Sequence, residues 1–413
     1  MPEFLSLIPP NQAQSILLEH LDDYWQIEKV AVNSAPGRIT AIDVNAPGPL
    51  PDFRRSTVDG FALVAKDTHG VSDSLPGYLV LVGEVPMGAV PNFTIQTGQC
   101  ALIHTGGMLP DGADAVIMLE NTQKANETEV EILKSLPEGE NVIQVGEDVS
   151  EDQVIIPAGR QLRSVEIGGL MAFGIQEVLV FRPPLVGLIS SGDEVVPPER
   201  SPMPGQVRDV NTYSLGAMFC REGGESKTYG IIPDQEDLLK QVAEQAMNEC
   251  DIVIISAGSS ASTRDLTVQV IRSLGEPGVL VHGVNLRPGK PTILAVCNGK
   301  AVIGLPGNPV SAYVAAWLFI VPVLRQLLHI SSPLPGPVYT ARLTINLPSV
   351  AGREDWIPVR IKPNAGQNEF LVEPVFGKSN LIFTLVRADG WIRIPPAANG
   401  LAAGERAEVY PLQ

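Results

Sequence analysis

Two neighbouring turns carry the strongest chemical signal in the sequence, LRPGKPT at 286–292 and GLPGNPVSA at 304–312. The first places Arg287 and Lys290 on either side of a Pro-Gly turn, which makes a compact pair of positive charges. The second leads at Pro309 into a predicted helix, whose first N–H groups have no partner within the helix and can bind an anion. A purely structural turn is the alternative, but cations beside a helix N-terminus favour an oxyanion site. Its residues would be Arg287, Lys290, Pro306, Gly307 and Pro309.

Carboxylates follow two further predicted strands. Asp193 and Glu194 come directly after the buried strand at 186–192. They suit a divalent cation or a polar ligand group there, and a solvated turn explains them equally well. Asp234 precedes a predicted helix, and the sequence favours it as the N-cap of that helix.

A loop of small residues, SAGSSASTRDLT at 256–267, joins another predicted strand to its helix. Gly, Ser and Ala allow backbone N–H groups to approach an anion closely, and Arg264 adds a positive charge. The loop is similar to a phosphate cradle, although it contains neither a Walker nor a Rossmann fingerprint. Asp265 could serve merely as the cap of the helix that follows.

These loops must be positioned by a segment, residues 183–330, in which apolar strands alternate with helices. That alternation predicts a parallel, doubly wound sheet with its ligands beyond the carboxyl ends of the strands. Before it, a helix is predicted over 11–27, with Asn11 as a possible N-cap, and residues 28–182 form short β-strands separated by Gly and Pro. After a Pro-rich linker at 331–337, the rest of the chain predicts a small β-barrel or sandwich.

Composition restricts the function classes. The 413 residues include 46 Asp+Glu and 29 Lys+Arg, a net charge of −17. This argues against a protein that coats nucleic acid or an anionic membrane, because both attract broad basic surfaces. The four widely spaced cysteines contain no CxxC pair and predict core thiols in a reducing compartment. No signal peptide is visible at the N-terminus, and the apolar run at 310–324 is short for a membrane span and predicts a buried helix.

Nucleophilic catalysis has little support. The sequence holds five histidines and neither GxSxG nor HExxH, which argues against a hydrolytic triad or a zincin.

Six motifs, taken together and in this order, resemble the molybdopterin molybdenumtransferases, the MoeA and gephyrin E-domain family, over essentially the whole chain. The motifs are PLPDFRRSTVDGFAL at 49–63, HTGGMLPDGADAVIMLE at 104–120, VGEDVS at 145–150, SSGDEV at 190–195, LRPGKP at 286–291 and GLPGNPVSA at 304–312. The resemblance implies insertion of molybdenum from molybdate into adenylylated molybdopterin, with Mg²⁺-dependent release of AMP. It also implies a cytoplasmic homodimer whose site lies between the α/β domain of one subunit and a β-rich domain of the other.

The resemblance implies four domains in each subunit. They would be an extended stalk at 28–49 and 148–182, an inserted β-rich domain at 50–147, an α/β molybdopterin-binding domain at 1–27 and 183–331, and a C-terminal β-barrel at 332–413. A molybdopterin adenylyltransferase and proteins that mature molybdoenzymes would be possible partners, with no nucleic acid or membrane partner.

The family's functional residues map onto this sequence position by position. Those in catalytic roles would be Asp59, Thr105, Asp148, Glu194, Asp234 and Asp265. Of these, Glu194, Asp234 and Asp265 would hold Mg²⁺. Those that bind molybdate or phosphate would be Arg287, Lys290, Ser311, Arg353 and Ser379. The turn residues Pro288, Pro306, Gly307 and Pro309 would join them in binding substrate, as would Arg264, which lies in a loop that departs from the family pattern.

The sequence also departs from the family pattern. Gly283 stands where a lysine is expected, Ile143-Gln144-Val145 lacks an arginine, and Pro358 replaces another arginine, although Arg360 lies nearby. These losses favour an alternative, a divergent paralogue that binds molybdopterin or its nucleotide without transferring metal. A second alternative, an adenylyltransferase of the same pathway, would resemble the α/β domain alone, and the additional β regions weigh against it.

Overall fold

The computed structural model describes residues 7–257, 261–330, 336–363 and 369–412, without the side chains of residues 261–264 and 339. Contacts divide the chain into two compact units. We call Met1–Ile42, Ala158–Arg163 and Glu177–Gln413 the α/β–barrel unit, and Asp43–Pro157 with Ser164–Gln176 the inserted unit. The residues of the predicted stalk, 28–49 and 148–182, are shared between these two units. The boundaries of the four domains stay a prediction.

The α/β–barrel unit is built on a six-stranded sheet in the order β16-β13-β17-β21-β20-β18. The strands are β16 (Glu225–Ile232), β13 (Leu185–Ser191), β17 (Ile252–Ala257), β21 (Lys300–Pro306), β20 (Ile293–Cys297) and β18 (Pro277–His282). The first four are parallel, as the sequence predicts, but β20 runs in the opposite direction and pairs antiparallel with both β21 and β18. The sheet is therefore mixed, because the Asn298-Gly299 pair, with φ values of 51° and 77°, closes a tight hairpin where a fully parallel sheet needs a helical crossover.

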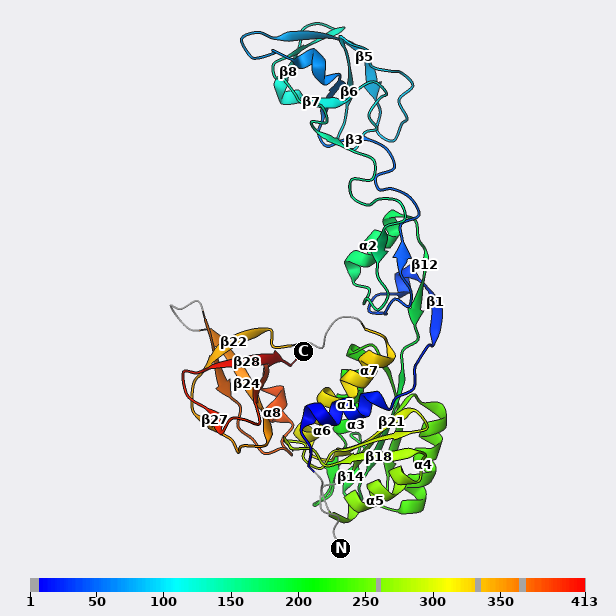
Figure 1. The fold of residues 1–413 in the computed structure, drawn as a ribbon, viewed down its shortest axis with the longest axis vertical. Coiled ribbons are helices and arrows are strands. Elements are labelled where there is room, and N and C mark those ends of the chain that lie inside the picture. Colours follow the sequence, from blue (N-terminus) through cyan, green and yellow to red (C-terminus); the bar gives the residue numbers. More distant parts are fainter. Residues whose placement is uncertain (1–6, 258–260, 331–335, 364–368, 413) are drawn as a thin grey trace. The chain divides into compact units, whose positions relative to one another are not determined.

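Helices cover both faces of this sheet (Figure 1). One face packs against α1 (Pro10–Glu19), α3 (Asn211–Arg221) and the continuous helix α6 (Pro309–Ala315), η4 (Ala316–Ile320) and α7 (Val321–Leu327). The other packs against α4 (Glu236–Glu249) and α5 (Ala261–Arg272). Both clusters consist mainly of Val, Ile, Leu and Ala side chains that the sheet and the helices bury together.

The N-terminal helix is shorter than its apolar spacing predicts. It ends at Glu19, and Ile27–Ala31 instead form β1, which pairs antiparallel with β12 (Glu177–Phe181). Strand pairing replaces the predicted helix only at Ile27, whereas residues 21–26 have no regular secondary structure and the Asp22 N–H donates to the Gly299 carbonyl. The N-cap is Pro9 rather than Asn11.

Within the described ranges, one helix, Pro309–Leu327, is long and apolar enough to cross a membrane. However, 72% of its most apolar window is buried inside the structure, as expected for the core helix that the sequence predicts. Three of the four cysteines are buried as well, but Cys220 on α3 is exposed, so the prediction of a core thiol is wrong there.

The C-terminal region is a closed barrel of five strands. They are β22 (Tyr339–Leu343), β24 (Glu354–Pro363), β25 (Phe370–Pro374), β26 (Gly390–Ile394) and β28 (Arg406–Pro411). Pairing of β24 with both β25 and β26 closes the ring. A two-residue strand from the α/β domain, β19 (Leu286–Arg287), is added to β24 from outside, so the barrel and the turn at 286–292 share one sheet.

Shorter elements complete this unit. They are η1 (Val32–Ser34), β14 (Val195–Val196), β15 (Val207–Arg208), β23 (Leu347–Pro348), α8 (Phe383–Val386) and β27 (Gly400–Leu401).

The inserted unit contains a six-stranded sheet in the order β7-β4-β6-β5-β9-β8. These strands are β7 (Ala115–Met118), β4 (Gly60–Leu63), β6 (Gln99–Ile103), β5 (Gly77–Val85), β9 (Glu129–Ile132) and β8 (Thr122–Lys124). Two small hydrophobic clusters fill the interior of this unit. Its remaining elements are β2 (Val44–Asn45), β3 (Arg55–Ser56), η2 (Ala65–Thr68), η3 (Leu119–Asn121), β10 (Val142–Ile143), β11 (Val154–Ile156) and α2 (Ser164–Ala172).

Candidate active site

A cavity of about 1020 Å³ lies between the turn that carries β19, the start of α6 and the barrel. We call it the cation cavity. Seven of the predicted binding residues line it: Arg287, Pro288, Lys290, Pro306, Ser311, Arg353 and Ser379. The structure therefore brings together residues that lie up to 92 positions apart in sequence, while their roles as ligand contacts stay a prediction.

The turn and the barrel are joined by backbone pairing. Leu286 lies opposite Glu354 and Arg287 opposite Asp355, in parallel register. Gly289 in this turn has a φ of 118°, and a Cβ there would approach Leu286 to 2.9 Å. Glycine is thus required for the Pro-Gly turn to fold back beside the strand.

Asp355 organises the arginines of the cation cavity. This carboxylate is 2% exposed and receives hydrogen bonds from Arg353 Nε at 2.7 Å and Nη2 at 3.0 Å. Arg287 Nη1 lies farther away, 3.6 Å from Asp355 Oδ2, and its side chain is 63% exposed. Arg353 is therefore held in a bidentate pair, whereas Arg287 remains accessible to a ligand.

The α6 helix and the barrel meet at Ser379. Asn308 Nδ2 donates to Ser379 Oγ at 3.1 Å, and the Val310 N–H donates to the Ser379 carbonyl at 3.0 Å. Pro309 has no N–H, and the Ala312 N–H donates to the Asn308 carbonyl. Protein acceptors thus occupy much of the helix N-terminus, so the side-chain cations, more than the predicted helix amides, make this cavity suitable for an anion.

A second cavity of about 570 Å³, the strand-end cavity, lies at the carboxyl ends of β13, β17 and β21. Glu194, Gly307 and Pro309 of the predicted site line it, and it shares Asn308 and Asn380 with the cation cavity. Open α/β sheets bind ligands at this end of their strands. The two cavities are therefore neighbours, separated by residues that line both.

Asn211 ties the strand ends together beneath this second cavity. Its Nδ2 donates to Ser256 Oγ and to the Gly307 carbonyl, both at 2.9 Å. Sequence analysis missed this residue, because an asparagine that starts a predicted helix is usually a simple cap.

The predicted acidic residues of the α/β domain are only partly brought together. Asp234 Oδ1 accepts a hydrogen bond from Ser191 Oγ at 2.8 Å, while its own N–H donates to Asp193 Oδ1 at 3.2 Å. The N-cap of α4 is Gln235, so the simple interpretation of Asp234 as a cap is wrong. Its contacts connect it instead to the end of β13.

Asp265 lies exposed in the second turn of α5, which begins at Ala261, so it is not the cap of that helix. The Arg264 side chain lies outside the described residues. Within the described part of the chain, no group of three or more His, Cys, Asp or Glu side chains is arranged to hold a metal ion. The assignment of Glu194, Asp234 and Asp265 to Mg²⁺ stays a prediction.

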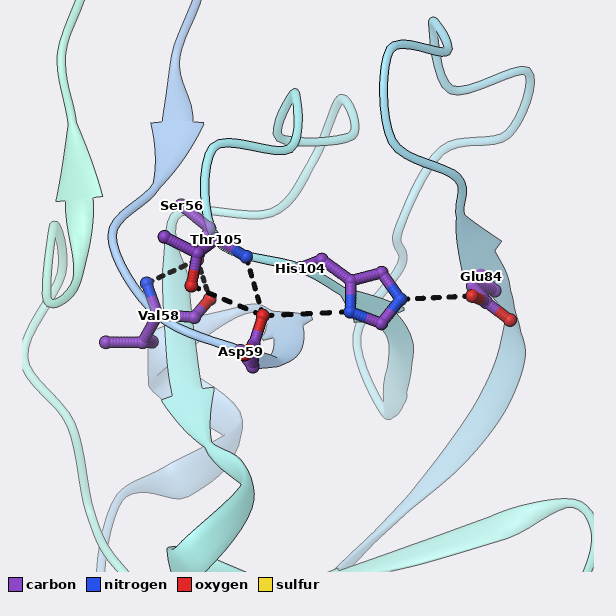
Figure 2. A network of polar contacts seen from close by, with 6 residues as sticks. All are labelled: Ser56, Val58, Asp59, Glu84, His104 and Thr105. Atoms are coloured by element: carbon purple, nitrogen blue, oxygen red, sulfur yellow. Dashed lines mark hydrogen bonds and ion pairs between the residues drawn. The ribbon is translucent and has the colours of Figure 1, made fainter.

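A hydrogen-bonded group in the inserted unit contains Asp59 and Thr105 (Figure 2). Asp59 Oδ1 accepts the Thr105 N–H at 2.8 Å and the Thr105 hydroxyl at 3.2 Å. His104 Nδ1 lies 3.7 Å from the same oxygen, and its Nε2 lies 3.1 Å from Glu84 Oε1. The Thr105 backbone hydrogen bond, its hydroxyl and the nearby His104 lower the pKa of Asp59, which is thereby stabilised as a carboxylate.

Asp148, also in the inserted unit, does not join this hydrogen-bonded group. Its N–H donates to the Leu50 carbonyl, and the residue is exposed.

The missing family cations are replaced only in part. Pro358 lines the cation cavity, but Arg360 does not, because its Nε donates to the Arg387 carbonyl beside a separate hollow. Lys378 does line the cation cavity. Lys378 and Asp355 were not predicted from the sequence, although Lys378 directly precedes Ser379 and Asp355 lies two positions after Arg353.

The class of protein follows from this combination: an α/β domain with a ligand region at its strand ends, fused to a closed barrel and carrying an inserted β unit. Family models match in the same order, the MoeA N-terminal region (domain I and II) at residues 8–174, a "Probable molybdopterin binding domain" at 187–326 and the MoeA C-terminal region (domain IV) at 340–412.

Individual relatives agree with the family models. The chain is 36% identical to the molybdopterin molybdenumtransferase of a Nostoc species over 75% of this chain and 72% of the relative. It is 30% identical to the molybdopterin molybdenumtransferase of Haemophilus influenzae over 97% and 98%. A crystal structure of a molybdopterin biosynthesis MoeA protein from Pyrococcus horikoshii superposes with a TM-score of 0.83 at 36% identity, covering 99% of this chain and 100% of that one. The chain belongs to the MoeA family.

Proposed function

We propose that this protein is a molybdopterin molybdenumtransferase that inserts molybdenum from molybdate into adenylylated molybdopterin and releases AMP. The observation that carries the proposal is the cation cavity, which is lined by Arg287, Lys290, Arg353 and Lys378 in a chain of net charge −17. Its volume, about 1020 Å³, suits a ligand much larger than a single oxyanion.

We assign different roles to the residues of the cation cavity. Arg353, fixed by Asp355, shapes the wall, while Arg287 and the two lysines are placed to neutralise molybdate or a phosphate group of the substrate. Ser311 and Ser379 can add neutral hydrogen bonds. In the inserted unit, Asp59 remains ionised at neutral pH and can accept a hydrogen bond from water or from the pterin.

Magnesium is part of the proposal. The donors around the end of β13, the carboxylates of Asp193, Glu194 and Asp234 with the Ser191 hydroxyl, are all oxygen atoms, which Mg²⁺ prefers. Mg²⁺ usually takes one or two carboxylates and completes its shell with water and substrate phosphate, so a preformed cluster of three side chains is not required. When bound, the ion would offset the charge of the phosphoanhydride.

We further propose a cytoplasmic homodimer that receives its nucleotide substrate from a molybdopterin adenylyltransferase and passes its product to proteins that mature molybdoenzymes. Family membership supports the dimer, and four free cysteines fit a reducing compartment. Sedimentation velocity on the purified chain should give twice the subunit mass.

The direct test supplies adenylylated molybdopterin, molybdate and Mg²⁺ and follows AMP by chromatography and cofactor by reconstitution of a molybdoenzyme. Both products should appear together and depend on Mg²⁺. Asp59→Ala and Asp265→Ala should each reduce turnover, and normal turnover in both would show that these residues are assigned wrongly.

The alternative, a paralogue that binds its ligand without metal transfer, is favoured by Gly283 and Pro358, where the family pattern carries cations. Gly283 is buried with a φ of 95°, so its position now has a backbone role. Tight binding of the adenylylated ligand without release of AMP would establish this alternative and refute the transferase.

A further inference from the structure

His104 in the inserted unit lies between two carboxylates. Its Nδ1 faces Asp59 Oδ1 at 3.7 Å and its Nε2 faces Glu84 Oε1 at 3.1 Å (Figure 2). Among the described residues, these are the two titratable groups in contact with the ring. Thr105, the other partner of Asp59, contributes neutral donors.

The ring lies between the two carboxylates. Its Nε2 is within hydrogen-bond distance of Glu84 Oε1, and its Nδ1 is at ion-pair distance from Asp59 Oδ1. A ring with a proton on each nitrogen would place a positive charge between two negative ones, which favours the carboxylate form of Asp59.

The sheet holds the three side chains in place. Asp59 directly precedes β4, His104 directly follows β6, and Glu84 lies on β5. β6 is the central strand of the three, with Gly60 opposite Ile103 and Glu84 opposite Leu102. Backbone pairing thus sets the spacing of the three residues, and their side chains remain between 39% and 57% exposed.

We propose that His104, anchored by Glu84, is a positioning residue that keeps the Asp59 carboxylate ionised and fixed against Thr105 for the reaction. All the contacts converge on Oδ1, so Oδ2 is left for substrate or water. The effect of His104 on Asp59 can be tested without any activity, whereas a role for it in the reaction rests on the proposed function.

The first experiment does not use activity. In protein labelled with ¹³C at aspartate carboxyl groups, NMR titration gives the pKa of Asp59, with Asp59→Asn assigning the signal. His104→Gln removes the imidazolium and should raise that pKa, and Glu84→Gln should raise it by less. His69→Gln is the matched control, because His69 is an exposed histidine of the same unit away from this group.

The second experiment measures AMP release. His104→Gln should lower kcat about tenfold with little change in KM, as expected when a contact that orients a reacting group is lost. His69→Gln should behave as wild type in every measurement.

The outcomes separate the two proposals. An unchanged Asp59 pKa in His104→Gln would refute the positioning role, whether or not the wild type releases AMP. A raised pKa in a protein that never releases AMP would refute the transferase and keep the positioning of Asp59. A lower kcat with an unchanged pKa would also refute this inference, because His104 would then act in some other way.

Discussion

Replacing Arg353 by alanine should destabilise the α/β–barrel unit, although the residue belongs to the predicted binding site. The substitution removes both hydrogen bonds to Asp355 and leaves a carboxylate that is 2% exposed. Breaking a buried ion pair costs about 3–5 kcal/mol because the remaining charge stays desolvated. Arg287, 3.6 Å away, can turn toward Asp355 and offset part of this. We therefore expect a loss of about 2 kcal/mol.

Chemical denaturation, monitored through tryptophan fluorescence, gives this loss directly. Trp356 and Trp391 lie in the barrel and are 4% and 2% exposed, so they report on the affected unit. A loss of about 2 kcal/mol corresponds to a melting temperature about 4 °C lower for a domain of this size. The matched variant Arg287→Ala should cost less than about 1 kcal/mol, because that pair is longer and more exposed.

The double variant Arg353→Ala with Asp355→Asn tests whether the unpaired charge of Asp355 causes the loss of stability. It removes the unpaired charge and should recover most of the lost stability. Equal losses in Arg353→Ala and Arg287→Ala, or a double variant less stable than Arg353→Ala, would refute the idea that a buried Asp355 makes Arg353 structural.

Three further predictions concern separate parts of the chain. Lys378→Gln should weaken molybdate binding about tenfold by calorimetry, because one charged contact contributes about 1.5 kcal/mol. Gly60→Ala should destabilise the inserted unit by about 3 kcal/mol in thermal unfolding, since its Cβ would lie 1.8 Å from the Ile117 carbonyl oxygen. Hydrogen bonds from Lys227, Tyr229 and Gln245 lower the pKa of Glu249 to about 2. The ionised Glu249 therefore contributes its full stabilisation above pH about 5, and this stabilisation is lost as the pH falls toward 2. Glu249→Gln should therefore make acid denaturation of the α/β–barrel unit less steep in that range.

The first two of these predictions have a control within the chain, and the third has a result that would refute it. Lys362→Gln removes a lysine that pairs with Glu373 on the barrel and does not line the cation cavity, so it should leave molybdate binding unchanged. Gly139→Ala adds a Cβ that meets no atom within 4 Å, and although its φ of 82° costs some strain, the loss should be smaller than at Gly60. If Gln at 249 leaves the acid transition unaltered, the pair with Lys227 has no part in it.

Much of the α/β domain could be predicted from sequence, because long buried strands and amphipathic helices alternate without interruption. β13, β16, β17 and β21 lie where the apolar runs predict them. The antiparallel part was missed because the Asn298-Gly299 hairpin signal sits between two runs that also suit parallel strands. The helix predicted over 11–27 was too long because contacts distant in sequence, such as the hydrogen bond from the Asp22 N–H to the Gly299 carbonyl, are not visible in local periodicity.

In the candidate site, too, some features could be predicted from the sequence and others could not. Rigid turns with cations indicated the cation cavity, because Pro and Gly restrict the backbone locally and leave a mark in sequence. Which arginine is structural could not be predicted, since that depends on the burial of Asp355 by β24 and β26. The Asp234 cap failed likewise, because Ser191, 43 positions earlier, supplies the partner.

The addition of β19 to the barrel limits how this protein can be recombined. Arg287 belongs by sequence to the α/β domain, yet its backbone completes a sheet whose other strands start at residue 339. A chimera that exchanges the barrel at the linker 331–337 would separate β19 from the β24 it is paired with. We therefore expect a foreign barrel to fold correctly in this chain only when the segment 286–292 comes from the same donor. The two stretches, although distant in the gene, should be inherited together.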